Sequence, residues 1–209
     1  MRGFRHLAAV IAIAGLVTGS AATAASAAAS QRAGARTAAA VRLRGGATAV
    51  TTAPGIAAAL LKNGIVPLAT WPGSQSVLSA KSGPAARFAF PVTGGTVTLS
   101  PLGGRVRRAG GILFLNVTDG KTIEVSRFTI DLSRADLTGI VNGNPKARVP
   151  LFRLDLSHAS LAAGKHVITA RGIGLTLTRA AATAMNAALG TRLFSAGLNL
   201  GTASTLLRY

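Results

Sequence analysis

Apolar and polar residues alternate along much of the chain after Arg87, where large side chains recur at every second position. Phe88 and Phe90, for example, alternate with smaller residues. A period of two is typical of strands with one buried face, so the pattern predicts a mainly β domain. The strand candidates are Ala47–Thr52, Thr96–Ser100, Ile112–Thr118, Lys121–Ser126, Leu137–Val141, Ala147–Leu156, His166–Thr178 and one or two strands within Leu193–Leu206.

Glycine and proline mark the connections between these strands. Asp119-Gly120 and Asn142-Gly143 favour tight type I′ hairpins, and Gly172 with Gly174 predicts a kink in a long strand. Prolines and small polar residues from Pro67 to Ser74 indicate a loop around Trp71. Three glycine pairs fit turns better than phosphate-binding loops: Gly94-Gly95, Gly103-Gly104 and Gly110-Gly111.

Two stretches depart from the strand period and predict short helices. Gly55–Lys62 has a helical pattern and is followed by Gly64, which suits the left-handed position after a helix. Arg179–Leu189 has Thr178 as a candidate N-cap and ends at Gly190. The expected fold is therefore an antiparallel β-sandwich or flattened barrel with two short helices, one at each end.

One sequence pattern occurs twice. Phe128–Leu137 and Phe152–Leu161 share the form F-x-[IL]-D-L-S-x-A-x-L, 24 residues apart. We interpret both as amphipathic strands of one sheet, each with an inward aromatic side chain. The two repeats would then place Asp131 and Asp155 side by side, and such a carboxylate pair is the chemistry of a glycoside hydrolase. Neighbouring arginines favour surface ion pairs for these aspartates instead.

The N-terminus has the form of a secretory signal. A short basic start precedes the uncharged apolar run Leu7–Val17, and Ala25-Ser26-Ala27 has the small-residue pattern of a cleavage site. We expect a secreted or cell-wall-associated protein without a membrane span after cleavage; an uncleaved anchor is the alternative. The expected division is 1–27 signal peptide, 28–46 flexible leader rich in Ala and Arg, and 47–209 β-rich domain.

The net charge indicates which kinds of molecule the domain contacts. The chain has 23 Lys and Arg against 5 Asp and Glu, a net charge of +18. Arginine-rich composition can follow from a GC-rich genome alone, but such a field also attracts polyanions. Arg105, Arg107 and Arg108 form the densest basic patch and are the candidate polyanion contact. The few aromatic residues argue against nucleic acid, which leaves anionic envelope polymers or lipid headgroups.

Few residues are available for catalysis or metal binding. The absence of cysteine excludes disulfides, thiolate metal sites and a cysteine nucleophile. Outside the signal the only histidines are His158 and His166, too few for a metal site of three or four ligands, so we expect no bound metal. No serine-elbow or phosphate-loop motif occurs. We therefore expect no enzyme, and a hydrolase using Asp131 and Asp155 is the weakest alternative.

Several motifs in 47–209 occur in an order that resembles a known domain type. They are Asn63–Ile65, Phe90–Gly95, Gly110–Phe114, Val149–Ser157, Leu175–Thr178, Ala184–Gly190 and Phe194–Ala203. Their order is similar to that of a secreted actinobacterial domain whose layout resembles the HtaA-type haem-uptake domain family. The resemblance implies an all-β extracellular module.

The haem-binding function of that family does not transfer easily to this sequence. Haem-binding members of that family use a tyrosine as iron ligand and a histidine to support it. Here the only tyrosine is Tyr209, no paired histidine is evident, and Arg108-Ala109 precedes Gly110-Gly111 where related sequences often have histidine. We expect a non-enzymatic domain without a cofactor that associates with the cell envelope or binds a ligand there. The alternative is haem or another amphipathic ligand in an apolar pocket.

Overall fold

Thirteen strands and two helices are formed by residues 39–80 and 83–209, the part of the chain that this computed structural model describes. In chain order they are β1 (Val41–Leu43), β2 (Gly45–Thr52), α2 (Ile56–Lys62), β3 (Ile65–Thr70), β4 (Ser74–Ala80), β5 (Gly83–Leu99), β6 (Leu102–Arg108), β7 (Gly111–Asn116), β8 (Thr122–Asp131), β9 (Asp136–Val141), β10 (Asn144–Asp155), β11 (Ser160–Gly164), β12 (Val167–Leu177), α3 (Arg179–Leu189) and β13 (Asn199–Arg208). The expected mainly β fold with two helices is confirmed.

Eight of the strands close on themselves. The ring runs β5–β2–β13–β12–β10–β9–β8–β6 and returns to β5, and every pairing is antiparallel. β6 closes it, because it pairs with β5 along one edge and with β8 along the other. The hydrogen-bonding pattern is that of a closed antiparallel barrel with additional strands: β1 and β4 on β5, β7 and β3 beyond β8, and β11 on β12.

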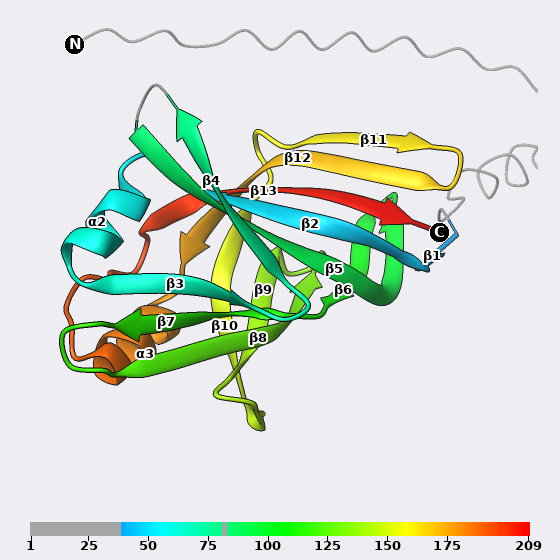
Figure 1. The fold of residues 1–209 in the computed structure, drawn as a ribbon. Helices are drawn as coiled ribbons and strands as arrows, with labels where there is room; N and C mark the ends of the chain where they lie inside the picture. The colour runs from blue at the N-terminus through cyan, green and yellow to red at the C-terminus, as the bar shows by residue number, and fades with distance from the viewer. Residues whose placement is uncertain (1–38, 81–82) are drawn as a thin grey trace, which may run out of the picture. The chain divides into compact units, whose positions relative to one another are not determined.

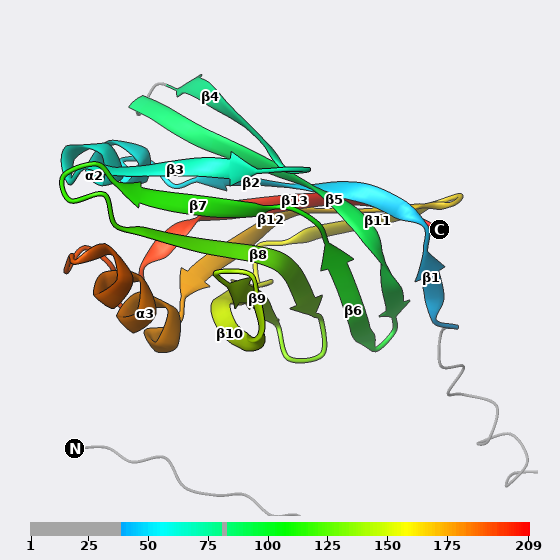
Figure 2. The same cartoon turned by 60° about the horizontal axis from the view of Figure 1, so that its bottom comes forward.

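Both helices lie at the same end of the ring, which corrects the expectation of one helix at each end (Figures 1 and 2). α2 leads directly into β3, whose first residue Ile65 pairs with Asn116 at the end of β7. The side-chain amide of Asn116 donates a 2.8 Å hydrogen bond to the carbonyl of Leu189, the last residue of α3. One buried asparagine thus joins the α2–β3 end of the fold to the C-terminus of α3.

The helix boundaries follow the capping residues. Thr178 accepts a hydrogen bond from the backbone N–H of Ala181, and α3 ends at Gly190 with a φ of 64°. Gly64 after α2 has a φ of 71°, as expected. No helix in the described part of the chain has the length and apolarity needed to cross a membrane.

The two predicted hairpins have different turns. Asn142 and Gly143 both have positive φ, 47° and 69°, which confirms the type I′ turn. At Asp119-Gly120 only the glycine has positive φ, and the pair lies in a longer loop closed by the backbone bond from Asn116 to Lys121. That type I′ prediction is wrong. The kink predicted for β12 is confirmed, because its register with β13 shifts between Ala170 and Ile173.

The predicted loop from Pro67 to Ser74 is wrong in part. Pro67 lies inside β3, and Ser74 begins β4. β3 pairs with β7 alone in the described sheet, so a proline without an N–H is compatible with its open side. Trp71, between the two strands, is 91% exposed.

Strand pairing within the described residues includes positions before the predicted boundary at residue 47. Val41–Leu43 pairs with β5, Gly45 pairs with Arg208, and the Leu43 side chain is buried. Residues 28–46 have few large apolar side chains, which predicts a flexible leader through residue 46. Val41–Leu43 and Gly45 nevertheless belong to strands, because their backbones pair with β5 and β13 and the Leu43 side chain is buried. The predicted signal peptide, 1–27, and the leader up to residue 38 lie outside the described residues.

Candidate ligand-binding site

The interior of the fold contains two apolar cavities. The first has a volume of about 150 Å³, and we call it the leucine cavity. It is lined by Val97, Leu99, Leu102, Val106, Arg108, Ile130, Leu132, Leu154, Leu156, Ala159, Leu161, Ile168, Ala170, Ile173, Thr205 and Leu207. The second, about 80 Å³, lies towards α2, β3 and β7 and is lined by Phe88, Phe90, Phe114, Phe128, Phe152 and Phe194 among others; we call it the phenylalanine cavity. Both arise because alternating strand positions point inward around the ring.

The leucine cavity reaches the surface. Leu102 and Leu161 line it and are themselves exposed, whereas Val97 and Ile168 deeper inside are fully buried. Exposed leucines around an apolar cavity are the arrangement expected of an opening through which an apolar molecule can pass.

Arg108 is the residue that lines both cavities. It is 4% exposed, although it is a charged residue at the end of β6. Its Nε donates a hydrogen bond to Thr48 Oγ1, and its Nη1 donates a long one, 3.4 Å, to the Val106 carbonyl. The guanidinium therefore lies in the middle of an otherwise apolar interior.

No carboxylate neutralises this guanidinium within the described residues. The ion pairs found there join Arg105 to Asp131 and Lys121 to Asp119, both at the surface. Desolvation by burial lowers the pKa of Arg108 well below its ordinary value, to about 9. Arg108 is still a cation at neutral pH, and a buried cation without a counter-ion destabilises a fold unless something compensates it.

The predicted arginine patch is divided by the strand geometry. Arg105 and Arg107 are exposed, whereas Arg108, with Val106, points inward, because side chains alternate along β6. A polyanion contact stays a prediction for Arg105 and Arg107, and the buried Arg108 is not available to a surface polymer.

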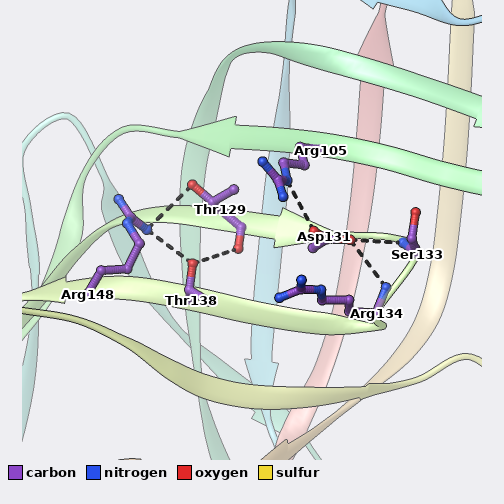
Figure 3. Close-up of polar contacts among 7 residues, drawn as sticks. All are labelled: Arg105, Thr129, Asp131, Ser133, Arg134, Thr138 and Arg148. Atoms are coloured by element: carbon purple, nitrogen blue, oxygen red, sulfur yellow. Dashed lines mark hydrogen bonds and ion pairs between the residues drawn. The ribbon is translucent and has the colours of Figure 1, made fainter.

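Arg105 and Arg107 belong to a basic outer face on β6 and β8–β10. Arg148 of β10 lies beside Thr129 and Thr138 and donates a 3.2 Å hydrogen bond to Thr138 Oγ1, and Arg105 donates a 3.1 Å hydrogen bond to Asp131 (Figure 3). The Nη2 of Arg148 also donates a 3.0 Å hydrogen bond to the carbonyl of Arg127. We call the exposed residues Arg105, Arg107, Arg127 and Arg148 the arginine face.

The expected carboxylate pair is not formed. Asp131 ends β8 and Asp155 ends β10, and β9 lies between them, so the expectation that they lie side by side is wrong. Two strand spacings of about 4.8 Å already separate the strands by roughly 10 Å. Neither aspartate lines either cavity.

The repeated pattern has a structural explanation instead. Asp131 Oδ1 accepts the backbone N–H of Ser133 at 3.1 Å, and Asp155 Oδ1 accepts that of Ser157 at 2.9 Å. Each repeat therefore encodes the end of a strand followed by an Asx turn. A hydrogen bond from Arg105 lowers the pKa of Asp131, and a hydrogen bond from Ser157 lowers that of Asp155. Both carboxylates are thus stabilised as anions, unlike a general acid, whose pKa is raised.

The lone tyrosine has a histidine neighbour, contrary to expectation. The rings of Tyr209 and His166 are 6.0 Å apart, and the Tyr209 hydroxyl donates a 2.8 Å hydrogen bond to the carbonyl of Gly164. His158 is exposed beyond the end of β10. Within the described ranges no three His, Asp or Glu side chains are grouped to hold a metal ion.

Comparison with known proteins identifies the fold. No family model matches the sequence, and no curated protein matches it significantly. The C-terminal domain of HtaA from Corynebacterium glutamicum superposes with a TM-score of 0.55 at 14% identity, over 80% of this chain and 98% of that chain. A domain-swapped dimer of a histidine-to-alanine variant of that domain gives a TM-score of 0.48 at 14% identity, over 94% of this chain and 100% of that chain. The first superposition confirms the expected HtaA-like fold.

Proposed function

We propose that this HtaA-like domain is a non-enzymatic binding module of the cell exterior that holds an amphipathic small molecule inside its strand ring. The observation that carries the proposal is the pair of cavities that meet at Arg108. Protein interiors are close-packed, and voids larger than a water molecule are few. A cavity of 150 Å³ matches the size of the engineered apolar cavity that takes up benzene in another protein.

The interior favours an apolar molecule over haem. Neither cavity is lined by a histidine, tyrosine or methionine, so the lining offers no usual axial ligand for haem iron. The Tyr209 hydroxyl, which donates to Gly164, lines neither cavity. These residues do not fit a haem site, and we expect no Soret shift when haem is titrated into the protein.

Filling the leucine cavity should weaken binding of a neutral alkyl ligand. Ala170→Leu adds three carbons to a residue that lines this cavity. We expect the affinity for 1-decanol, measured by isothermal titration calorimetry, to fall about tenfold, since three excluded methylenes correspond to more than 1.4 kcal/mol of apolar burial. Ala162→Leu, exposed on β11, is the matched control and should bind like wild type. Equal affinities for wild type and Ala170→Leu would contradict an interior site.

The arginine face supports a second proposal: electrostatic association with phosphate-bearing envelope polymers or lipid headgroups. Its four arginines have one ion-pair partner among them in the described residues, the Asp131 carboxylate bound to Arg105. The remaining positive charge lies on one outer surface of β6 and β8–β10, where it can contact a polyanion.

Neutralising the arginine face should reduce binding and its dependence on salt. Replacement of Arg105, Arg107 and Arg148 by glutamine should weaken retention on immobilised teichoic acid and on phosphatidylglycerol vesicles at 50 mM salt. Charge screening should also release the wild-type protein at 0.5 M salt. The control is the triple glutamine variant of Arg87, Arg179 and Arg192, which are exposed and lie outside β6 and β8–β10. Equal loss in both triple variants would mean that net charge, and not this face, determines binding.

A further inference from the structure

The unneutralised cation in the interior indicates the chemical class of the ligand. We infer that the interior binds an unbranched alkyl monocarboxylate, with the carboxylate on the Arg108 guanidinium and the alkyl chain in the leucine cavity. This inference rests on the proposed interior site and adds the chemical class of its ligand. Four features of the described residues support it: the position of the guanidinium, its unused donors, the single positive charge of the site and the composition of the cavity wall.

A chain of hydrogen bonds holds the guanidinium in place. Arg108 Nε donates to Thr48 Oγ1, which lies 2.8 Å from Thr205 Oγ1, and the Thr205 hydroxyl donates 3.3 Å to the carbonyl of Ala47. Because Thr205 gives its proton to Ala47, the Thr48 proton is directed at Thr205. The two threonines, paired across β2 and β13, are therefore positioning residues that engage Nε and fix the plane of the guanidinium.

The other end of the guanidinium is available to an anion. A guanidinium has five N–H donors, and the hydrogen bonds of Arg108 to described residues use two of them, at Nε and Nη1. Arg108 lines both cavities, so its unused donors have cavity space beside them. A carboxylate matches the fork of a guanidinium in geometry, and the pair is stronger in an apolar environment than in water.

The charge of the site favours a monoanion. One guanidinium neutralises one negative charge, and no second cation lines either cavity. A phosphate monoester carries about −1.5 to −2 at neutral pH and would leave a net negative charge in the apolar interior. A carboxylate leaves none.

The wall of the leucine cavity favours an alkyl chain over a ring. Apart from Arg108 and Thr205, every residue that lines it is Val, Leu, Ile or Ala. The aromatic side chains line the other cavity, beyond Arg108. A flexible aliphatic chain fits between branched aliphatic walls, and its far end would lie towards the exposed Leu102 and Leu161.

Titration calorimetry with three ligands of one chain length tests the inference on the wild-type protein. Delipidated protein is titrated with decanoate, 1-decanol and decyl phosphate. We expect decanoate to bind at least tenfold more tightly than 1-decanol, and decyl phosphate to bind more weakly than decanoate. Equal affinities for decanoate and 1-decanol would overturn the role of Arg108 while leaving the interior site intact. Tighter binding of decyl phosphate would overturn the carboxylate assignment, and failure of all three to bind would contradict the proposed function itself.

A variant series locates the effect at Arg108. Arg108→Met should lose about 10- to 100-fold in decanoate affinity and keep its 1-decanol affinity within threefold. It should remain folded, because removing an unneutralised buried charge relieves the fold of its desolvation cost. Arg87→Met, an exposed arginine on β5, is the control and should keep both affinities. If Arg108→Met does not fold, Thr48→Val is the second variant, and it should reduce the preference for decanoate over 1-decanol. An unchanged preference in the folded variant would overturn the inference.

Discussion

Replacement of Gly95 by alanine is expected to lower the free energy of unfolding by about 3–5 kcal/mol. Gly95 lies on β5 with a φ of 135°, which side chains rarely allow, and a Cβ there would collide with the carbonyl oxygen of Arg105 on β6. The two strands would have to separate where β6 closes the ring. Chemical denaturation followed by circular dichroism measures the loss.

The control for this substitution is Gly45→Ala. Gly45 also lies in a strand, but its backbone is not in the left-handed region and no atom lies within 4 Å of an added Cβ. We expect this variant to differ from wild type by less than about 0.5 kcal/mol. A Gly95→Ala protein as stable as Gly45→Ala would contradict the close pairing of β5 and β6 and hence the closed ring.

Replacement of Phe90 by alanine is expected to cost about 3–5 kcal/mol. Phe90 is 3% exposed, and its ring packs edge-to-face against Phe128 with the centroids 5.0 Å apart. The substitution removes that contact and enlarges the phenylalanine cavity. Benzene should therefore raise the melting temperature of Phe90→Ala more than that of wild type.

Trp71→Ala is the control for the loss of a large aromatic side chain. Trp71 is 91% exposed, so its removal leaves no cavity and should change stability by less than about 0.5 kcal/mol. If Phe90→Ala unfolded at the same denaturant concentration as Trp71→Ala, Phe90 would not pack in the interior as described.

Local chemistry made parts of the fold predictable from the sequence. Thr178 and Gly190 define α3 because capping and left-handed termination involve residues within a few positions of each other. The Asn142-Gly143 hairpin is specified in the same way, because its φ angles require these residue types. The period of two identified the strand faces that line the interior.

Ring closure was not predictable because its pairings are not local. Thr48 and Thr205 face each other across β2 and β13, although 157 positions separate them in the chain. β6, the strand that completes the ring, begins Leu-Gly-Gly and contains three arginines, so it lacks the apolar alternation that marks a strand. Its glycine pair, Gly103-Gly104, favours a turn in the sequence alone.

The candidate site can be recognised only when β6 is known to be a strand. Without β6, three neighbouring arginines look like one basic patch, and only strand alternation separates the exposed Arg105 and Arg107 from the buried Arg108. The fold resemblance to the HtaA domain was accessible from motif order, whereas the unneutralised cation between two cavities required the three-dimensional structure.

The location of a bound alkyl ligand tests the account most directly. The experiment uses decanoate anion that carries ordinary hydrogen and deuterated, methyl-labelled protein. Intermolecular nuclear Overhauser effects between the two report which side chains contact the alkyl chain of the ligand. We predict contacts to methyl groups of the leucine cavity, such as Leu154, Ile173 and Leu207, and none to the exposed Leu61 and Val77. Contacts confined to exposed methyl groups such as those of Leu61 and Val77 would contradict a binding site inside the ring.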